Sequence, residues 1–295
     1  MLLNYIKYKN KKVPVYLEDN KKDTTILFCH GINSSSDFIS KLEPFKKTYN
    51  VVAANFIGSK YTLKPNPDEI NIEDWINIGK LLLNSIKTKN IIVLGHSMGG
   101  VVALNLADDK RVNKVIMMST VNPTMTENNS YSILKSAIAP TNFVSDVIGK
   151  LIVKVSEKFK KTAKLVESFS KKGVWASLLE KVILNKEYLD SLGELYSANA
   201  EKMNFVVGSN DAIIGAKHFE KYANELGIPF TIIGKGHSPI KDDPIKANEY
   251  LNSFSLNKNR HWWNRFVTIK KHKIEFSSWK DIDDLNTEIL EELGE

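Results

Sequence analysis

The sequence predicts an α/β protein with a mostly parallel sheet that helices cover on both faces. Short apolar segments rich in β-branched residues alternate along the chain with segments whose apolar residues recur at helical spacing. This alternation is typical of a parallel sheet, because parallel neighbours need a long crossover connection that is usually a helix. A Gly-x-Ser-x-Gly turn at residues 95–99 joins one such strand to one such helix. The pattern therefore predicts both the fold class and a reactive serine at the edge of the sheet.

The chain opens with an expected antiparallel pair of strands, at residues 3–8 and 13–17, joined at residues 10–12. Strands and helices then alternate. Further strands are expected at residues 26–29, 51–55, 91–94, 112–119, 203–207 and 230–233, and helices near residues 37–47, 72–86 and 98–108.

Ser97 lies in a tight turn between the strand at 91–94 and a helix beginning near Met98. A nucleophile in a strained turn needs neighbours without side chains, and Gly95 and Gly99 provide them. The helix also points its free N–H groups at the place where an oxyanion would form. His96, inside the turn, is expected to be a packing residue.

A candidate acid and then a candidate base follow Ser97 along the chain, in the order expected for such a turn. Asp211 comes just after the strand at 203–207, and His237 lies in the loop after the strand at 230–233. Because the carboxyl ends of parallel strands meet at one edge of a sheet, these side chains should converge on Ser97. Singly, the aspartate could be a turn former and the histidine a solvated loop residue. Jointly, the sequence predicts a Ser97–His237–Asp211 triad.

The loop at the end of the strand at 26–29 begins with His30 and Gly31. An oxyanion hole needs two backbone donors, and we expect them at Ile32 in this loop and at Met98 after the nucleophile. His30 is expected to fix the loop rather than to act as the base, because His237 has the better position.

These motifs resemble those of the α/β-hydrolase superfamily, esterase/lipase type, over about residues 1–255: His-Gly at 30–31 and Gly-His-Ser-Met-Gly at 95–99. The resemblance implies the α/β-hydrolase fold and a serine hydrolase that cleaves small-molecule or lipid carboxylic esters through an acyl-enzyme, without a cofactor. Alternatives are a lysophospholipase or monoacylglycerol lipase acting at a membrane surface, and a non-catalytic binding protein on the same fold. Many relatives carry an aspartate in the segment that corresponds to residues 51–58, where this chain has none.

The resemblance also divides the chain. Residues 1–120 and 203–255 should form the hydrolase core, residues 121–202 a helical cap, and residues 256–295 a C-terminal extension. A cap supplies a substrate pocket and excludes water from the reacting centre.

The expected cap is basic. Residues 143–172 carry eight lysines against three acidic residues, a balance of +5 out of +7 for the whole chain. A basic amphipathic helix can lie on an anionic membrane, whereas a solvated lysine face is the simpler interpretation. The extension is aromatic and basic up to residue 280 and acidic after it, so it could contact a membrane or a partner or pack on the core. Nucleic-acid binding is not expected, because no recognition motif accompanies the charge.

Composition favours an ordinary globular protein of 295 residues with 42% hydrophobic and 25% charged residues. The single cysteine, Cys29, should be a buried apolar residue, and the scattered histidines show no metal-binding spacing. We find neither a signal-peptide pattern nor a membrane-spanning segment, so a cytoplasmic location is expected, with peripheral membrane contact as the alternative.

Overall fold

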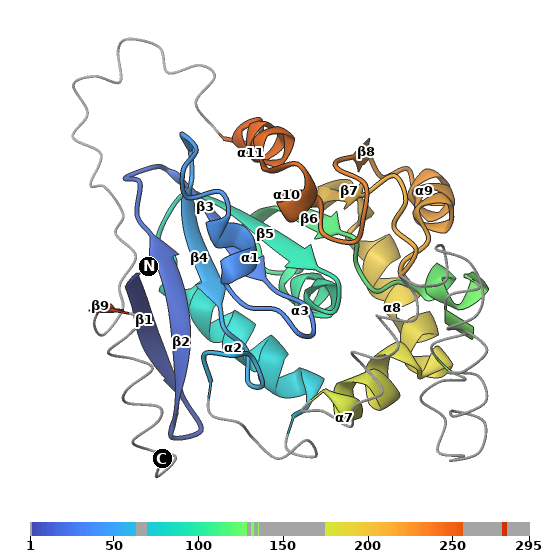
Figure 1. Cartoon of the computed structure of the whole chain (residues 1–295), viewed down its shortest axis with the longest axis horizontal. Helices are drawn as coiled ribbons and strands as arrows, with labels where there is room; N and C mark the ends of the chain where they lie inside the picture. The colour runs from blue at the N-terminus through green and yellow to red at the C-terminus, as the bar shows by residue number, and fades with distance from the viewer. Residues whose placement is uncertain are drawn as a thin grey trace, which may run out of the picture.

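The computed structural model describes residues 2–62, 70–128, 131–132, 135, 175–255 and 279–281. These residues form a nine-stranded sheet in the order β8-β7-β6-β5-β3-β4-β2-β1-β9 (Figure 1). Neighbours from β4 through β3 to β8 run parallel, and β2, β1 and β9 extend the sheet antiparallel. The strands are β1 (Leu2–Tyr8), β2 (Lys11–Glu18), β3 (Thr24–Cys29), β4 (Asn50–Ala54), β5 (Asn90–His96), β6 (Val112–Met118), β7 (Met203–Val207), β8 (Phe230–Ile232) and β9 (Trp279–Asp281). The predicted, mostly parallel sheet is confirmed.

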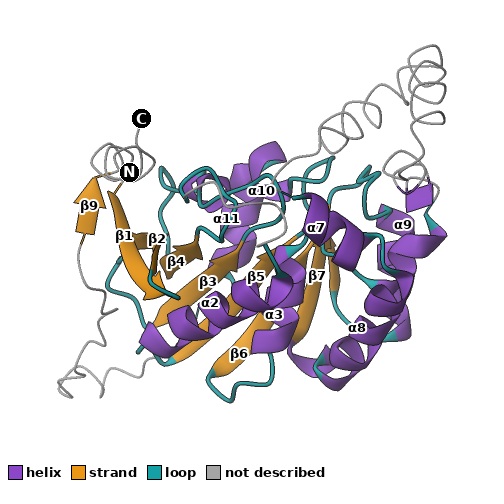
Figure 2. Cartoon of the chain, turned by 90° about the horizontal axis from the view of Figure 1, so that it is seen from below, coloured by secondary structure: helices purple, strands orange, loops and turns teal. Residues whose placement is uncertain are grey.

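Helices cover both faces of this sheet (Figure 2). One apolar cluster contains buried residues of α2 (Ile72–Ser85), α3 (Gly99–Leu106), α8 (Lys186–Ala198) and α9 (Ala216–Glu225). The second cluster, on the other face, contains buried residues of α1 (Asp37–Ser40), α10 (Pro239–Asp242) and α11 (Pro244–Asn252). Because side chains alternate along a strand, Leu27 of β3 belongs to the first cluster and Phe28 to the second.

The N-terminal hairpin turns at Lys9 and Asn10, slightly earlier than the predicted residues 10–12. Both residues have positive φ, 47° and 63°, as a two-residue hairpin turn that follows the twist of its strands requires. Asparagine tolerates this conformation better than most residues do, which explains the position of the turn.

The helix expected near residues 37–47 is wrong in length, because α1 ends at Ser40. Residues 42–45 continue in turns closed by short-range bonds, such as Leu42 N–H to Ile39 O at 3.0 Å. Pro44 has no N–H to donate and disfavours helical backbone at the residue before it, so the helical pattern cannot continue.

Between β6 and β7, the described residues are mostly helical: η2 (Pro123–Glu127), α7 (Ala176–Leu178), the π-helical η3 (Leu179–Ile183) and α8. The apolar residues of this helical segment at 178, 179, 182 and 183 are buried. The lysine-rich segment at 143–172 lies outside the described residues, as do residues 256–278 and 282–295 of the extension. Within the extension, β9 pairs antiparallel with β1, so this part of it does join the core sheet.

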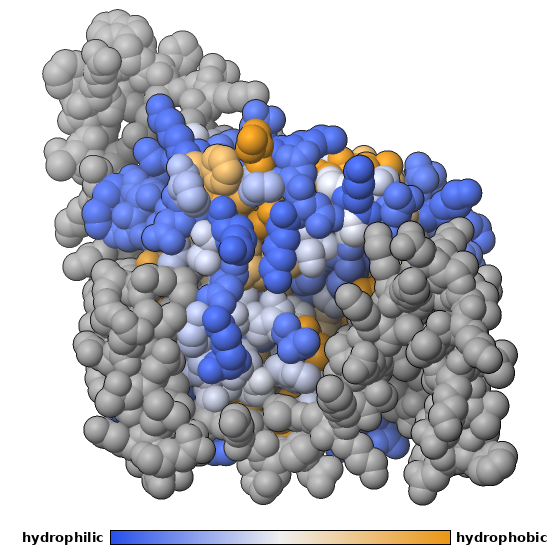
Figure 3. All heavy atoms as spheres, in the orientation of Figure 1, coloured by the Kyte–Doolittle hydropathy of each residue, from blue (hydrophilic) through white to orange (hydrophobic). Residues whose placement is uncertain are grey.

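On the face shown in Figure 3, the described surface is mainly hydrophilic, with apolar side chains visible in limited areas. Among the described residues, three large hydrophobic side chains are exposed: Leu81, Ile232 and Ile245. No helix in the described ranges is both long and apolar enough to span a membrane. Cys29 is fully buried, as predicted.

Candidate active site

Ser97 occupies the sharp turn between β5 and α3, with a positive φ of 54°. A non-glycine residue in this conformation is strained, and such strain is concentrated at functional sites. The predicted glycines allow the close approach: a Cβ on Gly95 would lie 2.8 Å from Gly100 Cα, and one on Gly99 would lie 2.1 Å from the Cys29 carbonyl oxygen. The turn is therefore held against both its own helix and strand β3.

The loop after β3 lies directly against the serine. A Cβ on Gly31 would be 2.7 Å from Ser97 Cβ and 3.2 Å from Ser97 Oγ, so only glycine fits here. The predicted donors flank this contact, Ile32 after Gly31 and Met98 after Ser97. Within the described part of the chain, neither N–H donates a backbone hydrogen bond to another residue.

His30 is fully buried at the start of this loop. Its Nε2 accepts a hydrogen bond from Phe56 N–H at 2.9 Å, and its Nδ1–H donates to the Gly31 carbonyl at 2.8 Å. The ring also packs against Phe56 and Trp75 at centroid distances of 4.9 and 5.4 Å. Because both nitrogens are engaged, His30 has no nitrogen available as a base, in agreement with its expected role in fixing the loop.

Asn55 holds the other end of the same loop. Its Oδ1 accepts from Ser36 N–H at 2.8 Å, and its Nδ2 donates to Ser36 Oγ at 3.2 Å, with both residues fully buried. Asn55 and Phe56 follow β4 consecutively, so two adjacent residues fix the two ends of the loop from His30 to Ser36. Sequence reasoning noted that this segment lacks an aspartate but missed this function of Asn55.

Asp211 and His237 meet as predicted. His237 Nδ1 lies 3.0 Å from Asp211 Oδ2, and Oδ1 of the same carboxylate accepts from the N–H groups of Ile213 and Ile214 at 3.0 and 3.1 Å. Burial acts to raise the pKa of Asp211, but the charge and hydrogen bond of His237, together with the N–H of Ile214, hold that pKa below its usual value. Because the Asp211 carboxylate can only accept a hydrogen bond, the proton of the neutral His237 ring lies on Nδ1. Its Nε2 then carries the lone pair that can accept a proton.

The loop that carries His237 is fixed by backbone contacts with the loop after β7. Asn210 N–H donates to the Lys235 carbonyl at 2.7 Å, and a Cβ on Gly208 would collide with the Gly236 carbonyl oxygen at 2.0 Å. Asp242 of α10 adds a side-chain anchor, because its Oδ2 accepts from the N–H groups of both Lys235 and Gly236. Sequence reasoning missed Asp242. Its position five residues after His237, at the end of a short helix, gave only a weak signal.

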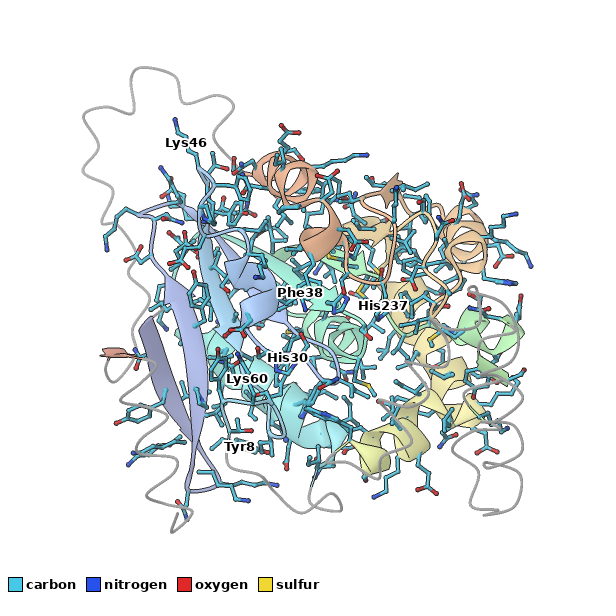
Figure 4. All side chains as sticks on the ribbon, in the orientation of Figure 1. Tyr8, His30, Phe38, Lys46, Lys60 and His237 are labelled. Carbon is cyan, nitrogen blue, oxygen red and sulfur yellow. The ribbon has the colours of Figure 1, made fainter. Side chains whose placement is uncertain are left out.

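In Figure 4, His30, Phe38 and His237 lie near the middle of the molecule, whereas Tyr8 and Lys46 lie toward its margins. The structure thus places Asp211 against His237, the loop of His237 against His96 next to Ser97, and Gly31 against Ser97 itself. Among the described residues, no group of three or more His, Cys, Asp or Glu side chains could hold a metal ion.

Two buried histidines at this site should make stability depend on pH. Burial lowers the pKa of His30 to about 4, and burial together with the neighbouring His237 lowers the pKa of His96 to about 3. In the unfolded chain both would titrate near pH 6.5. Below that pH the unfolded state binds protons that the folded state does not. The free energy of unfolding therefore decreases as the pH is lowered, by up to about 1.4 kcal/mol per pH unit for each histidine.

Urea unfolding at pH 7 and pH 5 measures this loss directly. The His96→Gln variant, which cannot titrate at this position, should lose part of the dependence. An unfolding free energy that is equal at the two pH values would contradict the prediction.

Comparisons with known proteins agree with this fold. A sequence model described as the alpha/beta hydrolase fold matches residues 24–240. A protein of Mycoplasma genitalium named "Putative esterase/lipase 2" is 28% identical over 254 residues, which cover 82% of this chain and 93% of that protein. Its namesake in Mycoplasma pneumoniae is 27% identical over 253 residues, which cover 82% and 92%.

Solved structures share the fold at low sequence identity. An N-acyl homoserine lactonase, AidH, superposes with a TM-score of 0.59 at 14% identity, over 88% of this chain and 99% of that one. A carboxylesterase structure from Nitrososphaera gargenis gives 0.57 at 16% identity, over 85% and 97%. These similarities extend to the fold alone.

Proposed function

The chain belongs to the α/β-hydrolase family, and we propose that it is a serine hydrolase that cleaves carboxylic esters. The observation that carries this proposal is the strained Ser97, whose neighbour His96 contacts the backbone of His237, together with the hydrogen bond from His237 Nδ1–H to a buried carboxylate. A serine hydroxyl is a poor nucleophile without such a base, and the base needs a partner to hold its tautomer.

In the proposed mechanism, His237 Nε2 removes the proton from Ser97 Oγ as the oxygen attacks the ester carbonyl. Asp211 holds the imidazole and stabilises the imidazolium that forms. The N–H groups of Ile32 and Met98 stabilise the tetrahedral oxyanion, and His237 then protonates the leaving alcohol. Water hydrolyses the acyl-enzyme with the same base, and the chemistry needs no cofactor.

The ester class is supported by the relatives named esterase/lipase. A binding protein that only retained the fold would have no physical need for a strained serine, a free Nε2 and a buried carboxylate together. A lipid ester at a membrane surface is the second candidate. It is favoured by the eight lysines of residues 143–172 in the sequence, which could bind anionic headgroups.

One experiment tests the function and separates the two substrate classes. The purified protein is treated with a fluorophosphonate probe and assayed on p-nitrophenyl esters of increasing acyl length, then on a monoacylglycerol and a lysophospholipid in neutral or anionic vesicles. We expect labelling and turnover of short esters. Faster turnover on anionic vesicles that salt suppresses would identify the lipid class. A folded protein that is neither labelled nor active on any ester would refute the proposal.

A further inference from the structure

His96 precedes the serine and is almost completely buried, at 4% exposure. Alternation along β5 directs it to the face covered by α1 and α10, the face to which Leu94 also belongs. Its ring stacks on Phe38 with a centroid distance of 4.1 Å and an interplanar angle of 27°.

A specific hydrogen bond accompanies this packing. His96 Nε2 lies 2.8 Å from the backbone carbonyl oxygen of His237, and the two imidazole centroids are 5.0 Å apart. Because a carbonyl only accepts, Nε2 must carry a proton. Nδ1 of His96 is buried and has no hydrogen-bond partner among the described residues. The contact therefore uses one nitrogen of the ring, in one tautomer.

This bond acts on the backbone from which the His237 ring projects. Asp211 fixes the ring at Nδ1, and the other attachment of the ring is its covalent bond to the side-chain Cβ, so the position of Nε2 also depends on where the His237 backbone lies. The bond from His96 fixes the carbonyl of the same residue to strand β5, one residue before Ser97. Proton transfer needs an oxygen-to-nitrogen distance of roughly 2.6–3.2 Å, and a displacement of about 1 Å can cost on the order of 100-fold in rate.

We propose that His96 is a positioning residue: its hydrogen bond holds the His237 loop in place relative to the strand that precedes the nucleophile. The inference rests on the proposed function, because it assigns His96 a role through His237. It goes beyond packing: the donor at Nε2, and not the bulk of the ring, sets the catalytic geometry.

Two substitutions of similar length separate these roles. His96→Gln retains an N–H donor at the end of a chain that reaches about as far as Nε2, whereas His96→Met has the same length and no donor. We expect His96→Met to lower kcat on a short p-nitrophenyl ester by roughly 10- to 100-fold, with KM changed by less than about threefold. His96→Gln should recover most of that loss. Equal activities for the two variants would overturn the proposal.

A double-mutant cycle then tests the route of the effect. In a His237→Ala background, His96→Met should cause less than about a threefold further loss, because the residue that it positions is already gone. A further loss of about tenfold would show that His96 acts elsewhere and would overturn the inference. If His96→Met does not fold, as judged by thermal melting, His96→Phe replaces it, since Phe keeps the ring on Phe38 without the donor.

Failure of the underlying function would look different. A wild-type protein that neither takes up the fluorophosphonate nor cleaves esters would overturn the proposed function, and this inference with it. A labelled, active wild-type protein with equal Gln and Met variants would overturn only the role of His96.

Discussion

Substitution of Ser97 by alanine is expected to lower kcat on p-nitrophenyl esters by a factor of at least about 10³ and to abolish fluorophosphonate labelling. In the proposed mechanism the hydroxyl is the group that attacks, and nothing else in the turn can replace it. The fold should survive, because alanine accepts the same φ of 54° at a cost similar to that of serine. Turnover, labelling and thermal melting of the purified variant measure all three expectations.

A serine outside the site provides the control. Ser253 is exposed at the end of α11, so Ser253→Ala should leave labelling and turnover unchanged. A Ser97→Gly variant should be as inactive as Ser97→Ala but at least as stable, since glycine adopts positive φ without strain. A Ser97→Ala protein that still hydrolyses esters near the wild-type rate would contradict the proposed nucleophile.

The strained turn at Ser97 could be predicted from the sequence because its determinants are local. Gly95 and Gly99 are required by contacts within a few residues and with the adjacent strand, so the spacing itself reports the geometry. The positions of Asp211 and His237 could also be predicted, because each follows a strand and parallel strands end at one edge. Local pattern and topology together were enough to predict these residues.

The supporting hydrogen bonds could not be predicted in this way. Asn55 reaches Ser36 across 19 residues, and His96 reaches the His237 carbonyl across 141 residues. Both bonds depend on where a loop passes over the end of the sheet. Alternation could assign His96 to one face of β5, but it could not identify the backbone atom that meets it there.

The predicted end of the first helix was wrong for a related reason. The apolar spacing near residues 37–47 favours a helix, yet α1 stops after four residues. Pro44 was a local signal against the longer helix. The hydrogen bond from Ser36 N–H to Asn55 Oδ1, at the start of α1, is a tertiary contact that fixes where the helix begins.

Substitution of His237 by alanine is expected to be nearly as damaging as Ser97→Ala, because the serine is unreactive without its base. The Ser97→Ala/His237→Ala double variant should be little slower than either single variant, since the two residues act as one unit. Asp211→Asn should also lose activity, on the order of 10⁴-fold in comparable triads, because a carboxamide no longer requires the Nδ1–H tautomer. Steady-state kinetics on one short ester measure each variant.

The His30→Ala variant tests whether His237 or His30 is the base. The buried His30 ring has both nitrogens engaged, with Phe56 N–H and the Gly31 carbonyl, so it can affect catalysis only by holding the loop that carries Ile32. We therefore expect a smaller loss in kcat than for His237→Ala, together with a lower melting temperature, because a buried N–H of Phe56 is left unpaired. If His30→Ala were inactive while His237→Ala kept wild-type turnover, His237 could not be the base. The hydrogen bond from its Nδ1 to Asp211 would then serve stability alone.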